Sequence, residues 1–218
     1  MPFFETLEHE TAGARSALLD APIVADALAG RVTREQYLAF LGRAYHHVKH
    51  TPALLMACGA RVPESLEWLR AAIAEYAQEE MGHHEWILGD IEAAGGDADA
   101  VRGGAAEFNT EMLVAYAYDI VARRNPVGLF GMVYVLEGTS IRLATSVAAS
   151  VQGALGLPPR AFTYLNSHGA LDIGHMRHFE ALMNRLEDAD DRASVVHCAN
   201  ACFRLYANVL GSIERRPS

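Results

Sequence analysis

Lysine is almost absent from this sequence, in which Lys49 is the only one and arginine supplies the rest of the fixed positive charge. Lysine and arginine together number 18 against 27 acidic residues, which gives a formal net charge of −9 at pH 7. A nucleic-acid-binding surface needs clustered positive charge to neutralise phosphates. We therefore expect no nucleic-acid partner.

Cysteine is also scarce, since the chain has only three. Cys58, Cys198 and Cys202 are too few and too scattered for a disulfide framework, and a reducing compartment fits them best. Cys198 and Cys202 lie one helical turn apart, where they form either a thiol pair or, more simply, part of a buried stripe of small residues. We expect a cytoplasmic protein.

Targeting and anchoring segments are not evident either. The chain begins with an acidic stretch rather than the basic one of a secretory signal, and we identify no apolar run with the length of a membrane span. We therefore expect neither a signal segment nor a membrane partner.

Strand signals are missing, because alternating runs of β-branched residues do not occur while Ala, Leu, Glu, Arg and Met dominate. A chain of 218 residues with 51% hydrophobic residues suits a single domain, here residues 1–218, with a sizeable core. Gly, Pro, Asn and Asp break the helical pattern at a few points only. These breaks predict an all-α bundle with helices over residues 3–19, 22–29, 34–58, 64–94, 105–124, 127–155, 159–186 and 190–213.

Glu80 and His83 lie three residues apart in the expected helix 64–94. This spacing places a carboxylate and an imidazole on one helical face, where they could bind one metal ion or help to bridge two. Glu-x-x-His is the half-site of carboxylate-bridged di-iron bundles. The spacing also arises by chance on charged helices, so this motif taken alone indicates a solvated face rather than a metal site.

A second candidate half-site lies in the expected helix 159–186. His168, Asp172 and His175 are spaced by four and three residues, so all three share one stripe over two turns. Their neighbours are Gly, Ala, Leu and Ile, which is unusual for a solvated helix face. This element predicts metal binding more strongly than the first one does.

Glu137 is the only carboxylate in the expected helix 127–155 and lies in an apolar run. A buried carboxylate must be protonated, hydrogen-bonded or bound to a cation. A buried Arg or Tyr partner would satisfy it as well as a metal would. Gly138 beside it leaves room for a close neighbour or a ligand.

Together these motifs supply three carboxylates and three imidazoles from three helices. Oxygen and nitrogen donors without thiolate suit iron or manganese better than structural zinc, which prefers a closed set of four ligands. Two ions that share six residues keep coordination positions open for dioxygen and a substrate. The candidate metal ligands are Glu80, His83, Glu137, His168, Asp172 and His175.

These residues resemble the pattern of the haem-oxygenase-like di-iron oxidases and oxygenases, also described as iron-containing redox enzymes. That family is related to thiaminase II and to PqqC-like proteins. Its pattern has a Glu and a His on one core helix, a lone Glu on another, and His-x-x-x-Asp-x-x-His on a third. The Glu–His spacing here is closest to that of the fatty-acid decarboxylases that make terminal alkenes, and since other members have a longer spacing, Glu79 stays open as an alternative to Glu80.

The resemblance implies a haem-oxygenase-like bundle of about seven to eight helices and an O2-dependent di-iron oxidoreductase. It further implies two iron ions, with manganese possible, an electron donor and a homodimer. The small-molecule substrate would be an amino acid, a fatty acid or an amine, which would undergo desaturation, C–C cleavage or N-oxygenation. The alternative is a metal-free cofactor-processing or ligand-binding protein of the thiaminase II or PqqC-like type.

This sequence lacks two residues on which the activities of some related proteins depend. Para-aminobenzoate synthases of this family are thought to sacrifice a lysine on the helix with the lone Glu, and this chain has none there. Thiaminase II relatives use a cavity cysteine, whereas none of the three cysteines lies on the helices with Glu137 and His168. A ferritin-like iron store is a weaker option, because it would need a cage-forming oligomer.

Substrate contacts are expected from a histidine-rich segment near residue 50 and from one tyrosine near Glu137. In the resembling fold the early helix borders the central cavity, and a histidine there can act as an acid or base near neutral pH. Hydrogen-bonded core side chains are an equally simple explanation. The candidate substrate-binding residues are Tyr45, His46, His50 and Tyr134.

Overall fold

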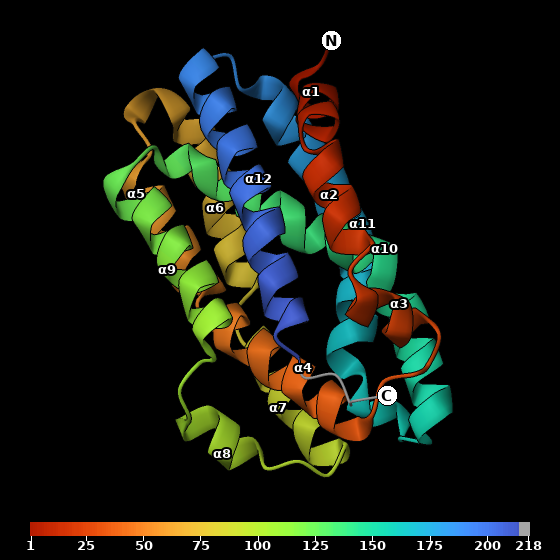
Figure 1. Cartoon of the computed structure of the whole chain (residues 1–218). Helices are drawn as coiled ribbons and strands as arrows, with labels where there is room; N and C mark the ends of the chain where they lie inside the picture. The colour runs from red at the N-terminus through yellow and green to blue at the C-terminus, as the bar shows by residue number, and fades with distance from the viewer. Residues whose placement is uncertain (214–218) are drawn as a thin grey trace.

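The computed structural model describes residues 1–213, except for the side chains of residues 168–174. Within this part of the chain every regular element is a helix and none is a strand (Figure 1). The prediction of an all-α fold is therefore confirmed.

Long helices form the bundle and short helical turns connect them. Most boundaries of the expected helices agree with the structure to within a few residues, while α8 was not predicted. The α-helices are α1 (Phe3–Glu10), α2 (Ala12–Leu19), α3 (Pro22–Leu28), α4 (Arg34–Val48), α5 (Thr51–Arg61), α6 (Glu67–Glu79), α7 (His83–Ala93), α8 (Ala98–Gly103), α9 (Phe108–Arg123), α10 (Leu129–Leu155), α11 (Thr163–Arg185) and α12 (Ala189–Gly211).

Three of the expected helices, 3–19, 34–58 and 64–94, are each divided in two. Pro52 lies in the first turn of α5, where its ring and its missing N–H prevent α4 from continuing. Gly82, with a φ of 87°, ends the run between α6 and α7. At Thr11 the backbone leaves the regular helical geometry while the hydroxyl donates to the carbonyl of Leu7 at 2.7 Å. The predictions of continuous helices here were wrong.

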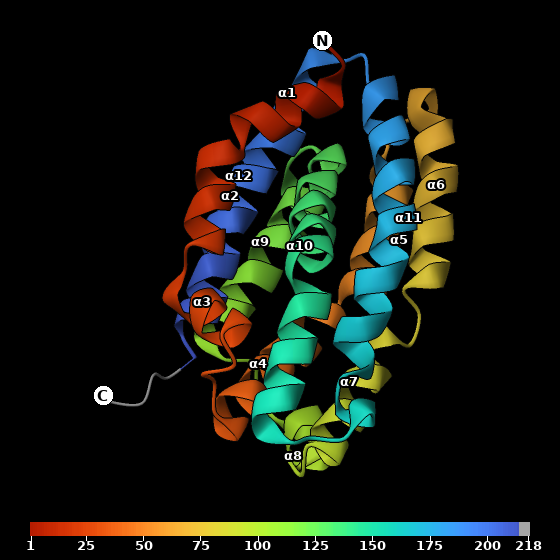
Figure 2. The same ribbon diagram turned by 90° about the vertical axis from the view of Figure 1, so that its right-hand side faces the viewer.

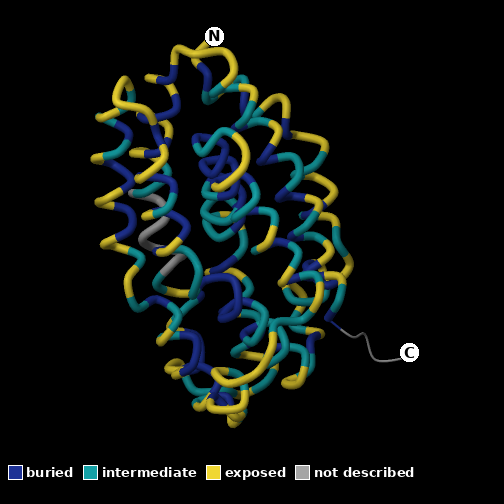
Figure 3. The backbone as a smooth tube through the Cα atoms, turned by 90° about the vertical axis from the view of Figure 1, so that its left-hand side faces the viewer, coloured by how far each residue is buried: buried dark blue, intermediate teal, exposed yellow. Residues whose placement is uncertain are grey.

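The long helix α10 forms the centre of the bundle, between α11 and α12 (Figure 2). By length and composition, residues 126–155 could also cross a membrane, so the expectation that no apolar run is this long was wrong. However, 61% of the most apolar window is buried inside the protein, as in the core helix of a bundle. Figure 3 shows how buried and exposed residues alternate along the outer helices.

Two contacts fix the position of α10 and α11 within the bundle. Gly131 allows α10 to approach α12 closely, because a Cβ atom there would lie 2.5 Å from the backbone nitrogen of Ala199. Asp90 of α7 is fully buried and accepts the backbone N–H groups of Thr163 and Tyr164 at 2.9 and 2.8 Å. This carboxylate caps the first turn of α11 and stabilises its positive end. The helices that carry Glu137 and His175 are thereby held at defined positions.

Candidate metal centre

Glu80 and His83 lie together at the break between α6 and α7. His83 Nδ1 is 3.1 Å from Glu80 Oε2, and the two side chains are 6% and 12% exposed. They do not share the face of one continuous helix, as the spacing predicted. The left-handed Gly82 turns the chain between them, and the pair meets across this turn.

Glu137 and His175 form a second carboxylate–imidazole pair, between α10 and α11. His175 Nδ1 lies 3.7 Å from Glu137 Oε1, and the side chains are 16% and 11% exposed. Tyr76 of α6 packs its ring against His175 at 5.6 Å between centroids and donates its hydroxyl to the carbonyl of that residue at 3.2 Å. The same contact therefore connects α6, which leads into Glu80, with α11.

Glu79 also belongs to this group of side chains. Its Oε2 is 3.2 Å from His175 Nε2, so the two ring nitrogens of His175 face carboxylates on opposite sides. Glu79 is 56% exposed, whereas Glu80 is 12% exposed. This difference favours Glu80 as the inner carboxylate and gives Glu79 the outer place, from which it can orient the imidazole.

A cavity of about 80 Å³ lies against this group, and both Glu80 and Glu137 contribute to its wall. Four of its lining residues were not among the predicted site residues: His47, Tyr76, Ser140 and Tyr164. The cavity is lined by His47, Val48, Thr51, Leu54, Leu55, Tyr76, Glu80, Leu129, Met132, Val133, Leu136, Glu137, Ser140 and Tyr164.

The other candidates in the histidine-rich segment do not line this cavity. His46 Nδ1 lies 3.1 Å from Lys49 Nζ, and that ammonium lies 5.0 Å from the centre of the Tyr45 ring. His50 Nδ1 is 3.2 Å from the Tyr118 hydroxyl on α9. The pKa values of His46 and His50 are both lowered, mainly by burial and to a smaller extent by the positive charge of Lys49. Both imidazoles are therefore held neutral near pH 7.

Tyr134 also lies away from the wall that contains Glu137. Its hydroxyl accepts a hydrogen bond from Arg15 at 2.8 Å, and its ring packs on Phe4 and Phe179. It lines a different depression, together with Gly138 and Phe203. Its expected contact with substrate stays a prediction, as does that of Tyr45, His46 and His50.

The predicted ligands His168 and Asp172 lie outside the side chains that the structure describes. Among the described side chains, no three His, Cys, Asp or Glu residues are close enough to hold a metal ion. Two donor atoms that bind one ion at about 2 Å lie about 3 Å apart, which is close to the separation within each of the two pairs. The buried oxygen and nitrogen donors thus fit the chemistry of an iron site, and no thiolate is among them.

Comparison with known proteins identifies both a family and a fold. A family model described as iron-containing redox enzyme matches residues 38–207, a range that contains all six candidate ligands. Among curated proteins, none matches this sequence.

Solved structures resemble this chain over almost its whole length. A domain of unknown function with a haem oxygenase-like fold from Shewanella denitrificans is 26% identical, with a TM-score of 0.85 over 96% of this chain and 91% of that one. A TenA homologue from Pseudomonas syringae is 8% identical, with a TM-score of 0.79 and coverage of 97% and 92%. Haem oxygenase-1 from the cyanobacterium Synechocystis, in complex with haem, is 15% identical, with a TM-score of 0.75 and coverage of 98% and 93%. The predicted haem-oxygenase-like fold is confirmed.

Proposed function

Because this chain belongs to the family of iron-containing redox enzymes, we propose that it is an O2-dependent oxidoreductase with two non-haem iron ions. Its substrate is a small molecule, and an external electron donor restores the ferrous state. One observation supports this proposal above all others. The Glu80–His83 and Glu137–His175 pairs are largely buried, and one carboxylate of each pair, Glu80 and Glu137, lines the same small cavity.

The residues that would hold the iron are these four, together with His168 and Asp172. Two ferrous ions would supply electrons and open coordination positions, which the reaction with dioxygen requires. The protein supplies orientation, because Glu79 on the outer nitrogen of His175 fixes the ring and leaves the inner nitrogen facing Glu137. The apolar wall, which includes Leu54, Leu129 and Met132, keeps water from the reacting group.

The likeness in fold to the TenA homologue supports a second candidate, a metal-free ligand-binding or cofactor-processing protein. The described cysteines do not favour a thiolate mechanism in such a protein. Cys58 donates to the carbonyl of Pro126 at 3.2 Å, and burial raises the pKa of its thiol to about 12. Cys198 and Cys202 are buried on α12, and none of the three lines the cavity.

Anaerobic titration with ferrous iron distinguishes the two candidates. We expect about two irons per wild-type chain by metal analysis, with oxygen uptake and transient visible absorption when air is admitted. Glu137→Ala and His175→Ala should each reduce the iron content to one or less, because a ligand is lost. His197→Ala is the matched control, since His197 lies exposed on α12. No iron in the wild type, or unchanged iron in both site variants, would favour the metal-free candidate.

A further inference from the structure

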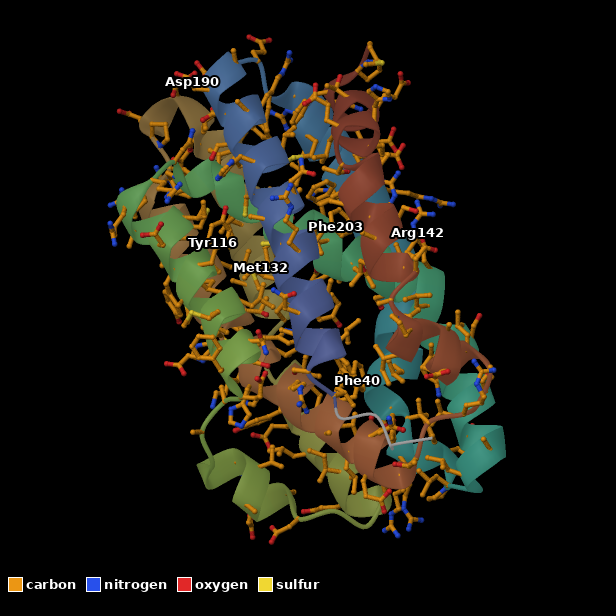
Figure 4. The ribbon with its side chains drawn as sticks, in the orientation of Figure 1. Phe40, Tyr116, Met132, Arg142, Asp190 and Phe203 are labelled. Atoms are coloured by element: carbon orange, nitrogen blue, oxygen red, sulfur yellow. The ribbon has the colours of Figure 1, made fainter. Side chains whose placement is uncertain are left out.

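A second cavity, of about 120 Å³, lies directly beyond the first one. Leu136, Ser140 and Tyr164 line both cavities and form the wall between them. The second cavity extends among α3, α4, α10, α11 and α12, and Figure 4 labels Phe40 from this cavity and Met132 from the first one. The second cavity therefore adjoins the space beside the candidate metal centre.

The wall of the second cavity carries no charged group among the side chains that the structure describes. Its lining residues are Ile23, Val24, Ala27, Val32, Gln36, Tyr37, Phe40, Leu136, Thr139, Ser140, Leu143, Ala144, Val147, Val151, Tyr164, Leu165, Tyr206, Leu210 and Ile213.

Most polar side chains within this wall either form hydrogen bonds to other groups of the protein or carry no charge. The Tyr37 hydroxyl donates to the carbonyl of Ala161 at 2.6 Å, and Gln36 Oε1 accepts the N–H of Thr33 at 2.8 Å. Burial raises the pKa of Tyr206 to about 12, so its hydroxyl stays protonated at neutral pH. A buried ammonium or carboxylate of a ligand would find no counter-charge on these side chains and would lose its hydration.

Ser140 lies where the two cavities meet. Its Oγ is fully buried and has no hydrogen-bond partner among the residues that the structure describes. A buried hydroxyl without a partner costs roughly the free energy of a lost hydrogen bond, so a ligand atom or a water that bonds to it is favoured. The two cavities thus differ in chemistry and share one polar point at their junction.

We propose that the two cavities together form one substrate site, which accepts a molecule with an uncharged apolar body. This body occupies the second cavity, and the reacting end passes Ser140 to reach Glu80 and Glu137. The assignment rests on the function proposed above and narrows its substrate class. For the metal-free protein it disfavours free amino acids, because their carboxylate would lie either beside Glu80 and Glu137 or against the uncharged wall of the second cavity.

The volumes also limit the size of the substrate. A cavity of about 150 Å³ with apolar walls holds one benzene molecule, which has six heavy atoms. By the same ratio the two cavities together hold about eight heavy atoms.

Ligand binding to the metal-free protein tests this assignment without any turnover. We would titrate 1-octanol and L-leucine, two molecules of nearly equal size, in a calorimeter at two temperatures. We expect 1-octanol to bind with a negative heat-capacity change and L-leucine to bind at least tenfold more weakly. Equal binding of the two ligands, or no binding of 1-octanol, would overturn the proposal. Iron content is measured separately, so failure of the metal centre and failure of the cavity assignment give different results.

Three variants of α10 locate the bound molecule. Ala144→Phe fills the second cavity and should weaken binding of both 1-octanol and 1-butanol at least tenfold, whereas Ala149→Phe, on the exposed side of the same helix, should weaken neither. Ser140→Leu closes the junction and should weaken 1-octanol but spare 1-butanol, whose five heavy atoms fit the second cavity alone. Circular dichroism establishes that each variant is folded, and Val147→Phe replaces Ala144→Phe if that variant is not. Unchanged 1-octanol affinity in a folded variant with a filled second cavity would refute the assignment.

Discussion

The turn at Gly82 gives a prediction whose magnitude follows from the backbone alone. Gly82 has a φ of 87°, and a Cβ atom added there would have no heavy atom within 4 Å. Replacement by alanine therefore introduces no clash, and its cost is that of placing an L-residue in the left-handed region. That cost is about 1–2 kcal/mol. We expect Gly82→Ala to lower the free energy of unfolding by this amount.

Gly89 provides a matched control in the helix that follows. It lies exposed in the interior of α7, its φ is not positive, and a Cβ atom there would also have open space. Here alanine removes the entropic cost of glycine in a helix and should stabilise the protein by about 0.5–1 kcal/mol. The same substitution, seven residues apart, is thus expected to have opposite signs.

Thermal and urea unfolding measure both effects. For a chain of this size each kcal/mol shifts Tm by about 2–4 °C, so Gly82→Ala should lower Tm by roughly 2–8 °C. Gly82→Asn should restore part of the loss, because Asn tolerates the left-handed region better than Ala. Iron affinity should fall together with stability in Gly82→Ala, since the turn brings Glu80 to His83. A Gly82→Ala protein as stable as the wild type would refute this account of the break.

Two further predictions concern the carboxylates that hold α11 in place. Burial raises the pKa of Asp90 above its ordinary value of 3.8, against the opposing effect of its two backbone hydrogen bonds, so the native state binds the proton more tightly than the unfolded state does. The wild type should therefore gain stability relative to Asp90→Asn as the pH falls from neutral toward 3.8. Urea titrations of both proteins measure this as the free energy of unfolding of the wild type minus that of the variant. A difference that stays constant or decreases as the pH falls would contradict this prediction. Glu79→Gln should reduce iron affinity about tenfold or more while leaving Tm almost unchanged, because Glu79 is half-exposed and acts by orienting His175. The control is Glu75→Gln, which changes an exposed carboxylate of the same helix. An equal loss of iron affinity in this control would refute the role of Glu79.

Helix content and most helix ends were predictable because they depend on local chemistry. Thr33 begins α4 with a capping box, in which the side chain of Gln36 accepts the backbone N–H of Thr33. The division of three expected helices was missed although signals for two of them were present. Gly82 and Pro52 are both helix-breaking residues, but each stands among strong helix formers that hide the break. Thr11 is a weaker signal, because threonine also occurs inside continuous helices and its bond back to the carbonyl of Leu7 is visible only in the structure.

The grouping of the site residues was predictable to the extent that spacing determines it. Glu80 with His83 and Glu137 with His175 are neighbours in the structure, while their role as ligands stays a prediction. The outer position of Glu79 was not predictable, since adjacent residues of one helix end differ only in direction. Both residues keep helical backbone geometry, so their directions follow the rotation of α6 within the bundle, which the sequence does not reveal.

Helix phase explains the histidine-rich segment in the same way. His46, His47 and His50 offer three imidazoles within two turns, and the sequence alone does not determine which of them lines the cavity. Of the three, His46 and His50 were predicted to contact the substrate and His47 was not. In the structure α4 packs between α7 and α9, which directs His47 into the cavity wall while His46 faces Lys49. After α4 ends, His50 belongs to the start of α5 and faces Tyr118 instead. A residue's part in such a site is therefore decided by the rotation of its helix, and this rotation depends on contacts between helices that are distant in the sequence.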